Sequence, residues 1–299
     1  MRTLGGRYRL DEEIGVGGMA RVWRAYDHVL DREVAVKLLV TAGDSSAFER
    51  ARNEARHAAR LAHPNVAAVY DFGTSQRGGR GTAYLVMELL DGPLLSDRLR
   101  RGPLDWHFAA RVAAEVSAGL AAAHGHDIVH RDVKPGNIAL TPTGAKLLDF
   151  GIAAGAGEAD RIVGHTIVGT AAYIAPERLQ GRPVMPATDM YSVGVLLYQM
   201  ITGELPWPSN TDEELLNSHR LATPAPLPRI DGLADEVGDI YAGCLDKRPS
   251  ERPTAVAAAL LLAATVDAQV YLPPISGPPQ HRAPLAEDPL DAVTSAYAS

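Results

Sequence analysis

The most specific pattern in the chain lies near its middle, where His130-Arg131-Asp132-Val133-Lys134-Pro135-Gly136-Asn137 is followed by Leu148-Asp149-Phe150-Gly151. Its spacing places the Asp132 carboxylate where a substrate hydroxyl could deliver its proton. It also supplies an amide, Asn137, and a second carboxylate, Asp149, as the hard oxygen ligands that Mg²⁺ prefers. Taken alone, Asp132 or Asn137 could simply cap a turn, but that does not explain the ordered set. The pattern therefore predicts a hydroxyl-activating base beside a magnesium site.

A lysine and a glutamate nearer the N-terminus form a second candidate pair. Lys37 ends the apolar run Val34-Ala35-Val36-Lys37, in which alternate side chains of a strand would point into the core. A buried ammonium needs a partner, and Glu54 on the following predicted helix is the candidate, because Glu49 lies more than a turn away. Each residue taken singly is more often a solvated surface charge. Together they predict an ion pair that aims Lys37 at phosphate oxygens.

A glycine-rich run, Gly15-Val16-Gly17-Gly18-Met19-Ala20-Arg21-Val22, lies between two strand-like segments. Glycines let a backbone approach phosphates closely and offer amide donors, although a plain hairpin turn is the alternative reading. The run precedes a strand rather than a helix, which disfavours a dinucleotide-binding fold. It also departs from the pattern G-x-G-x-x-G-x-V, because Ala20 replaces the third glycine.

Two regions with different residue patterns, one typical of strands and one typical of helices, must position these side chains. Up to about residue 88, the patterns predict strands at 8–14, 20–26, 33–40, 67–72 and 83–87, a helix at 48–61 and an exposed hairpin turn at 74–82. Beyond residue 93 they predict helices at 94–100, 106–126, 188–202, 212–218, 235–244 and 254–266. A small β-rich lobe therefore precedes a larger α-rich lobe. This arrangement belongs to the α+β class, and the cleft between the lobes is the expected ligand site.

Composition excludes several classes of protein. The 299 residues are 46% hydrophobic, and the net charge of -7 offers no basic surface for nucleic acid or anionic lipid. The single cysteine, Cys244, cannot build a disulfide framework, so a reducing cytoplasm is expected. The longest apolar stretch, 255–266, is shorter than the ~20 residues that a membrane span needs. Residues 269–299 contain six prolines and are expected to form a disordered tail.

Taken in order, these motifs resemble those of Hanks-type protein kinases, and the chain is similar to bacterial eukaryotic-like serine/threonine kinases over residues 8–264. The resemblance implies a short N-terminal tail, 1–7, and a bilobal kinase domain, 8–268. The domain would divide into an N-lobe (8–88), a hinge (88–92) and a C-lobe (93–268). It further implies transfer of the ATP γ-phosphate to serine or threonine hydroxyls of protein substrates, with Mg²⁺, or Mn²⁺ in its place.

Residue roles follow from the matching positions. The resemblance implies that the glycine-rich run covers the phosphates through Gly15, Val16, Gly17 and Gly18, that Lys37 pairs with Glu54, that Asp132 is the catalytic base, and that Asn137 and Asp149 bind the metal. For the adenine it implies Val22 and Ala35 above the ring, Met87 as gatekeeper, Glu88 and Leu90 as hinge hydrogen-bonding residues, and Ala139 below the ring. Ala139 is smaller than the leucine or methionine often found there, so a loose pocket floor is expected.

The same resemblance extends to regulation and support. Lys134 and Thr170 match residues that shape the acceptor site of serine/threonine kinases. Arg131 suggests control by a phosphate on the segment 151–177, with Thr166 as the expected phosphorylation site, added by a second copy in a transient homodimer. A buried Glu177–Arg252 ion pair and an Asp189 that anchors the catalytic loop are also implied.

Two rival functions remain to be weighed. A pseudokinase would usually lack one of the lysine, base or metal-binding positions, but all are present here. A small-molecule phosphotransferase can share the loop around Asp132, but Ala175-Pro176-Glu177, Lys134 and the long segment before them favour protein substrates.

Overall fold

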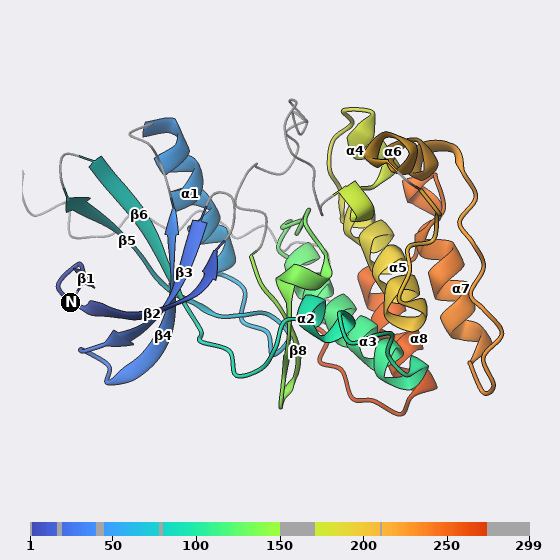
Figure 1. Cartoon of the computed structure of the whole chain (residues 1–299), viewed down its shortest axis with the longest axis horizontal. Helices are drawn as coiled ribbons and strands as arrows, with labels where there is room; N and C mark the ends of the chain where they lie inside the picture. The colour runs from blue at the N-terminus through green and yellow to red at the C-terminus, as the bar shows by residue number, and fades with distance from the viewer. Residues whose placement is uncertain are drawn as a thin grey trace, which may run out of the picture.

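The first part of the chain forms a six-stranded antiparallel sheet in the computed structural model, which describes residues 2–16, 20–39, 45–77, 80–149, 171–209 and 211–273 (Figure 1). The strands lie in the order β1-β2-β3-β4-β6-β5. Their bounds are β1 Arg2–Leu4, β2 Tyr8–Val16, β3 Ala20–Asp27, β4 Arg32–Leu39, β5 Val69–Arg77 and β6 Arg80–Met87.

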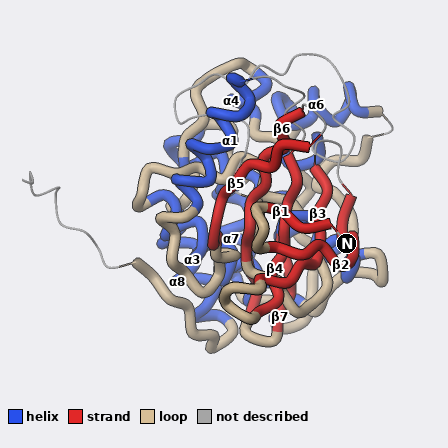
Figure 2. Tube along the Cα trace, turned by 90° about the vertical axis from the view of Figure 1, so that its left-hand side faces the viewer, coloured by secondary structure: helices blue, strands red, loops and turns tan. Residues whose placement is uncertain are grey.

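Strand β4 is buried on both faces, and this places Lys37. Its residues Val34, Val36 and Leu38 pack in one apolar cluster on one face. Ala35 packs on the opposite face, against Leu85, Met87 and Ala55 of helix α1 (Ser45–Ala58). Because side chains alternate along a strand, Lys37 shares the face of Ala35 and therefore points toward the α1 side of the sheet. Figure 2 shows α1 alongside the β5 edge of the sheet.

The second lobe is built around two buried helices, α3 (Trp106–His124) and α5 (Pro186–Thr202). Asp105 caps α3 by accepting a hydrogen bond from the His107 amide. The other helices are α2 Leu95–Leu99, α4 Pro176–Leu179, α6 Asp212–Leu221, α7 Asp235–Cys244 and α8 Ala255–Thr265. On α5, a Cβ at Gly194 would lie 2.7 Å from Cβ of Cys244 on α7, so the close approach of these helices requires glycine.

A two-stranded hairpin, β7 (Ile138–Thr141) and β8 (Gly144–Leu147), lies at the boundary of the lobes. Strand β8 is hydrogen-bonded to the loop that joins α1 to β5: the Leu147 amide donates to the Asn65 carbonyl, and the Ala67 amide donates to the Leu147 carbonyl, both at 2.9 Å. The Asn65 side chain donates to the Ala145 carbonyl at 2.8 Å. The loop that the sequence assigns to the small lobe is thus attached to the large one.

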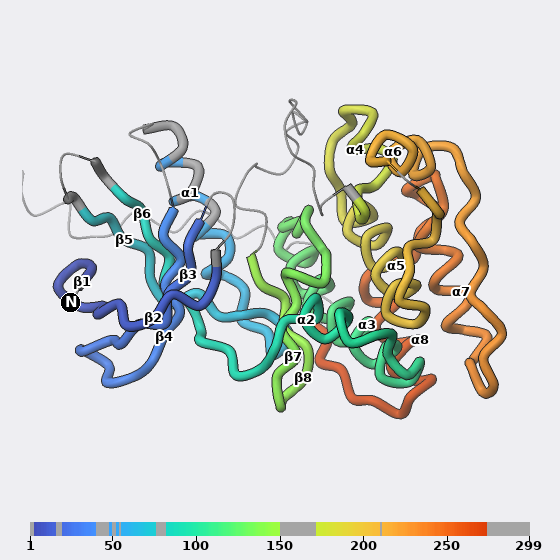
Figure 3. The backbone as a smooth tube through the Cα atoms, in the orientation of Figure 1, coloured from blue at the N-terminus to red at the C-terminus, as the bar shows by residue number. Residues whose placement is uncertain are grey.

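The two ends of the domain differ from the prediction. Residues 1–7 were expected to be a tail, but β1 pairs with β2 and Leu4 is buried in the apolar cluster of the sheet. The C-terminal boundary was placed at 268, yet the chain continues in contact with the large lobe to Leu272. Val266, Ala268, Val270 and Leu272 alternate in sequence and pack on its core. We call residues 266–273 the C-terminal strap; it returns from α8 toward the small lobe (Figure 3).

The predicted hairpin turn at 74–82 is also too long. Strands β5 and β6 pair through this segment as far as Arg77 and Arg80, which leaves only 78 and 79 between them, outside the described residues. Across the residues that the structure describes, no helix combines the length and apolarity needed to cross a membrane.

Candidate active site

The predicted catalytic loop, residues 130–137, is held by a buried carboxylate at the start of α5. Asp189 is 1% exposed and accepts hydrogen bonds from the backbone amides of His130 at 2.8 Å and Arg131 at 2.7 Å. Arg131 has φ of 70°, a left-handed conformation that costs a non-glycine residue roughly 1–2 kcal/mol and must be stabilised by its surroundings. Nε2 of His124 lies 2.8 Å from the same carboxylate. Asp189 therefore fixes the strained turn that presents the next residue, as predicted.

Burial and hydrogen bonding act in opposite directions on Asp189. Burial alone would raise the pKa of its carboxyl, but the hydrogen bond and charge of His124 and the His130 amide hold that pKa below its ordinary value. The carboxylate is therefore ionised at neutral pH, and the hydrogen bonds that it accepts from the loop are charge-assisted.

Asp132 follows this turn and lies partly open to solvent, with its side chain 33% exposed. Its Oδ2 is 2.7 Å from Nζ of Lys134. Nδ2 of Asn137, in a 3₁₀ turn at Pro135–Asn137, donates to both the carbonyl and Oδ2 of Asp132 at 2.8 Å. A cation and an amide thus orient the carboxylate in a position open to a substrate hydroxyl. Because Nδ2 of Asn137 is used in this way, its Oδ1 is the atom available to a cation.

Asp149 meets Lys37 across the lobe boundary. Nζ of Lys37 lies 2.8 Å from Oδ1 of Asp149, and the lysine side chain is only 11% exposed. The backbone before Asp149 is tied to the catalytic loop, because the Leu148 amide donates to the Asn137 carbonyl at 2.9 Å and Nε2 of His130 lies 2.8 Å from the Leu148 carbonyl. These contacts, with those of Asp132, join Lys37, Asp149, Asn137, Asp132 and Lys134 into one constellation.

The donor set suits a hard divalent cation. The Asn137 amide oxygen and the Asp149 carboxylate are neutral and anionic oxygen donors, and Mg²⁺ is typically held by one or two such groups together with phosphate oxygens and water. Among the described residues no cluster of three or more His, Cys, Asp or Glu side chains offers a closed metal site. The arrangement fits an ion that arrives with a phosphate substrate.

The residues predicted to surround the adenine come from β3, β4, β6, the hinge and β7. Val22 and Met87 join Ala35 in the apolar cluster under α1. The Glu88 amide donates to the Ala68 carbonyl at 2.9 Å, which leaves the Glu88 carbonyl as its hinge group toward a ligand. Leu90 follows in the described hinge. Ala139 is 2% exposed on β7, where it bridges to Leu94.

Sequence reasoning missed an ion pair at the hinge. Nζ of Lys146 on β8 lies 2.6 Å from Oε1 of Glu88, and the Ala68 amide donates to Oε2 of Glu88 at 3.3 Å. The hinge is thereby joined to the hairpin below the adenine site. Burial alternates along β8, with Ala145 and Leu147 buried, but four residues are too few for this alternation to be recognised in the sequence.

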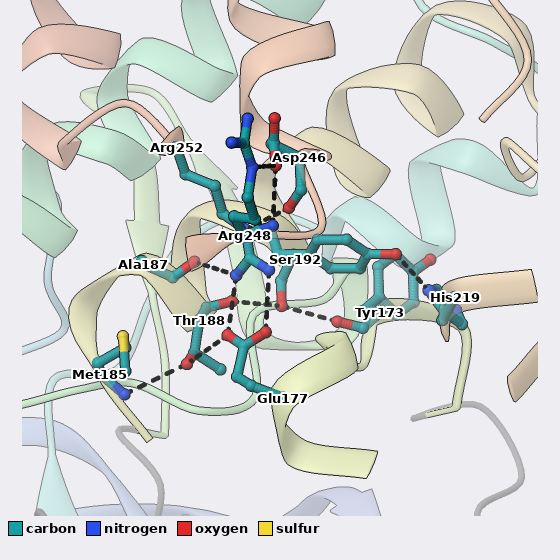
Figure 4. A network of polar contacts seen from close by, with 11 residues as sticks. Tyr173, Glu177, Met185, Ala187, Thr188, Ser192, His219, Asp246, Arg248 and Arg252 are labelled. Atoms are coloured by element: carbon teal, nitrogen blue, oxygen red, sulfur yellow. Dashed lines mark hydrogen bonds and ion pairs between the residues drawn. The ribbon is translucent and has the colours of Figure 1, made fainter. Parts of the chain in front are cut away.

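The predicted Glu177–Arg252 ion pair is present (Figure 4). Two hydrogen bonds of 2.8 and 2.9 Å join the guanidinium to the carboxylate, and both side chains are at most 2% exposed. Arg178, on α4 next to Glu177, was not predicted. Its Nη1 donates to the Arg131 carbonyl at 2.5 Å and so links α4 to the catalytic loop.

Several predicted residues cannot be placed. Gly17, Gly18, Thr166 and Thr170 lie outside the described residues. Val16 and Glu54 belong to β2 and α1, but their side chains are not described, so the Lys37–Glu54 pairing stays a prediction. Gly15 is described and pairs with Val22 across β2 and β3.

Comparisons with known proteins agree with this geometry. The protein kinase domain family matches residues 8–261. The chain is 43% identical over 255 residues to the serine/threonine-protein kinase PknA of Mycobacterium tuberculosis, a match that covers 84% of this chain and 59% of PknA. It is 41% identical over 259 residues to PksC of Streptomyces coelicolor, covering 83% of this chain and 47% of PksC. PknB of M. tuberculosis is 38% identical over 256 residues, with 83% of this chain and 41% of PknB covered. The chain thus matches about half the length of these relatives.

Proposed function

Because the chain belongs to the protein kinase domain family, we propose that it is a serine/threonine protein kinase that transfers the γ-phosphate of ATP to hydroxyl groups of protein substrates. The observation that carries the proposal is the hydrogen-bonded constellation that runs from Lys37 through Asp149 and Asn137 to Asp132. It offers a phosphate-binding cation, oxygen donors for a metal and a base within one connected set of side chains and backbone groups.

In this mechanism Asp132 orients the acceptor hydroxyl and accepts its proton as the oxygen bonds to the γ-phosphorus, while the bond from that phosphorus to the β–γ bridging oxygen breaks and ADP leaves. Lys134, 2.7 Å from the base, offsets the charge that gathers between acceptor and phosphoryl group. Lys37 binds phosphate oxygens of the nucleotide, and the Asp189 network keeps the loop in place. When bound by Asn137 and Asp149, Mg²⁺ or Mn²⁺ would neutralise charge on the phosphates.

The remaining predictions belong to the same proposal. Lys134 together with Thr170 favours serine and threonine over tyrosine as acceptor. Thr166 is the proposed activating phosphorylation site, and transfer between two copies of the chain in a transient dimer is the proposed route. Such a kinase would act in signal transduction.

Incubation of the full chain with γ-labelled ATP and Mg²⁺ tests this function. The wild type is compared with Asp132→Asn and with a control variant, Asp231→Asn, whose substitution lies in an exposed turn. Removal of the base should lower turnover by about 100- to 10,000-fold while ATP binding is kept. The control should retain full activity. Label on serine or threonine that disappears in Asp132→Asn supports the proposal. ATP binding with no transfer by the wild type would instead indicate a nucleotide-binding module.

A further inference from the structure

A groove outside the catalytic cleft lies between α1 and β5. It has a volume of about 270 Å³ and is lined by Arg52, Ala55, Arg56, Ala59 and, on β5, residues 69–72. None of the described catalytic residues contributes to it. The groove borders the helix that carries Glu54, so whatever fills it will affect the position of that helix.

The lining combines an apolar floor with a basic rim. Ala55 is buried, and Val69 and Phe72 are half-buried members of the cluster under α1. Arg52 and Arg56 are exposed on α1. The side chain of Arg52 is 46% exposed and, within the described part of the chain, makes a loose ion-pair contact of 3.6 Å with Glu49.

The acid of the lining, Asp71, is already engaged. It accepts a hydrogen bond of 2.6 Å from the Tyr8 hydroxyl, and its carboxylate lies 3.8 Å from the Arg7 guanidinium. The groove therefore suits a segment that alternates apolar and acidic side chains, because the arginines can pair with carboxylates while the floor covers apolar groups.

The C-terminal strap brings the rest of the chain to one end of this groove. Nε2 of His63, four residues beyond Ala59, lies 2.9 Å from the Tyr271 carbonyl, and the described chain ends at 273. The following 26 residues contain three acids, Glu287, Asp288 and Asp291, all within the segment Leu285-Ala286-Glu287-Asp288-Pro289-Leu290-Asp291-Ala292-Val293. We call residues 285–293 the acidic segment.

The chain between the strap and the acidic segment is long enough for the segment to reach the groove. The eleven residues 274–284 can span up to about 36 Å when extended. The helix from Ala59 back to Arg52 is only about 10 Å long. A flexible tether of this length gives an effective concentration of about millimolar, so a contact of about 4 kcal/mol, from ion pairs together with apolar burial, is sufficient for half occupancy.

We propose that the acidic segment binds in the groove between α1 and β5 of the same chain, with its carboxylates on Arg52 and Arg56 and its leucines on the apolar floor. Bound there, it braces α1 and favours the position in which Glu54 can meet Lys37. This consequence for activity rests on the proposed kinase function, whereas the docking itself does not.

Cysteine cross-linking in the full chain tests the docking directly. The native Cys244 is fully buried and burial raises its pKa to about 12, so it will not interfere. Ala59→Cys on the groove is combined with Ala286→Cys in the acidic segment, and disulfide formation is followed under mild oxidation with diamide.

The control pairs Ala59→Cys with Gln280→Cys, which lies closer to the strap in sequence. We expect the first pair to close at least about five-fold faster, because a docked segment raises the local concentration. Equal rates would overturn the proposal, and so would disulfides formed mainly between chains.

A charge exchange on the same cysteine background separates docking from misfolding. Arg52→Glu with Arg56→Glu, or Glu287→Arg with Asp288→Arg and Asp291→Arg, should each slow cross-linking about five-fold, as expected for two or three exposed ion pairs. The combined exchange should restore the rate to within about two-fold of the starting protein. Unchanged rates, or a loss that the combination does not restore, would refute the assignment.

Turnover measured on these variants distinguishes the two proposals. Activity that falls and recovers with cross-linking supports the bracing of α1. Cross-linking that behaves as expected in a protein without any phosphotransfer would leave the docking established and the kinase function refuted.

Discussion

Substitution of Arg252 by methionine is expected to destabilise the large lobe strongly, because it leaves a buried charge unpaired. The guanidinium makes two bonds to Glu177 and donates to the carbonyls of Ala187 and Asp246, each at 2.8 Å. In the variant, the Glu177 carboxylate keeps the hydroxyl of Thr188 at 2.9 Å as a donor but loses its cation. Breaking one side of such a buried pair costs about 3–5 kcal/mol, which corresponds to a fall in Tm of about 6–20 °C for a domain of this size.

The pH dependence of this loss provides a sharper measurement. In the wild type, burial would raise the pKa of the Glu177 carboxyl, but Arg252 holds it below its ordinary value. Its contribution to stability is therefore present above about pH 4.3, the pKa in the unfolded chain, and is lost as pH falls through the lower folded value. In Arg252→Met, burial without a cation raises that pKa, so the variant gains stability as the carboxyl protonates. The difference in unfolding free energy between the two proteins should be largest near pH 7 and shrink toward pH 4.

Urea denaturation followed by fluorescence at several pH values measures both quantities. Arg248→Met is the matched control, since that arginine is 71% exposed in the same loop and its ion pairs should contribute at most about 1 kcal/mol. A loss below about 1 kcal/mol for Arg252→Met, or a difference that stays constant between pH 7 and pH 4, would refute the argument that a buried charge is left unpaired.

Three further predictions concern the hinge, the helix packing and the strap. Lys146→Met removes the ion pair with Glu88, and steady-state kinetics should show KM for ATP raised by about five-fold with little change in kcat. The reason is that a partly buried ion pair contributes about 1 kcal/mol to the position of the hinge. Lys146→Arg should retain most of the affinity for ATP. Gly194→Ala forces a methyl group against Cys244 and should cost about 1–3 kcal/mol in thermal unfolding; no measurable loss would show that the helices can separate. His63→Ala removes the hydrogen bond to the Tyr271 carbonyl of the strap and should speed chymotryptic cleavage after Tyr271 about five-fold. An unchanged cleavage rate would mean that side-chain packing alone holds the strap.

The sequence predicted most of what depends on regular patterns. Period-two and helical spacing located the main strands and helices. The ordered motifs predicted a base and metal ligands whose side chains the fold brings together, and they predicted the Glu177–Arg252 pair, which the structure confirms. These features are local in sequence or fixed by motif order, so they can be recognised without knowing how distant segments meet.

What the sequence did not predict depends on contacts between distant segments. Strands β1, β7 and β8 have three or four residues each, too short for a periodic pattern to emerge. His124 and Lys146 are ordinary polar residues until the fold brings them to Asp189 and Glu88. Residues 269–273 of the strap were assigned to a disordered tail because the six prolines of 269–299 outweighed an apolar alternation that only Val270 and Leu272 continue into this stretch.

The attachment of the α1–β5 loop to β8 has a mechanical consequence for α1. Because the loop is hydrogen-bonded to the hairpin of the large lobe, we take the C-terminal end of α1 as the fixed point, the fulcrum, about which the helix rotates. The helix is about 20 Å long. A rotation of about 10° about that point would move the first turn by about 3.5 Å but the backbone of Glu54, some 6 Å from the fulcrum, by only about 1 Å. Displacements at the far end of α1 are therefore reduced several-fold at the backbone of Glu54, so a large swing of the first turn becomes a fine adjustment there.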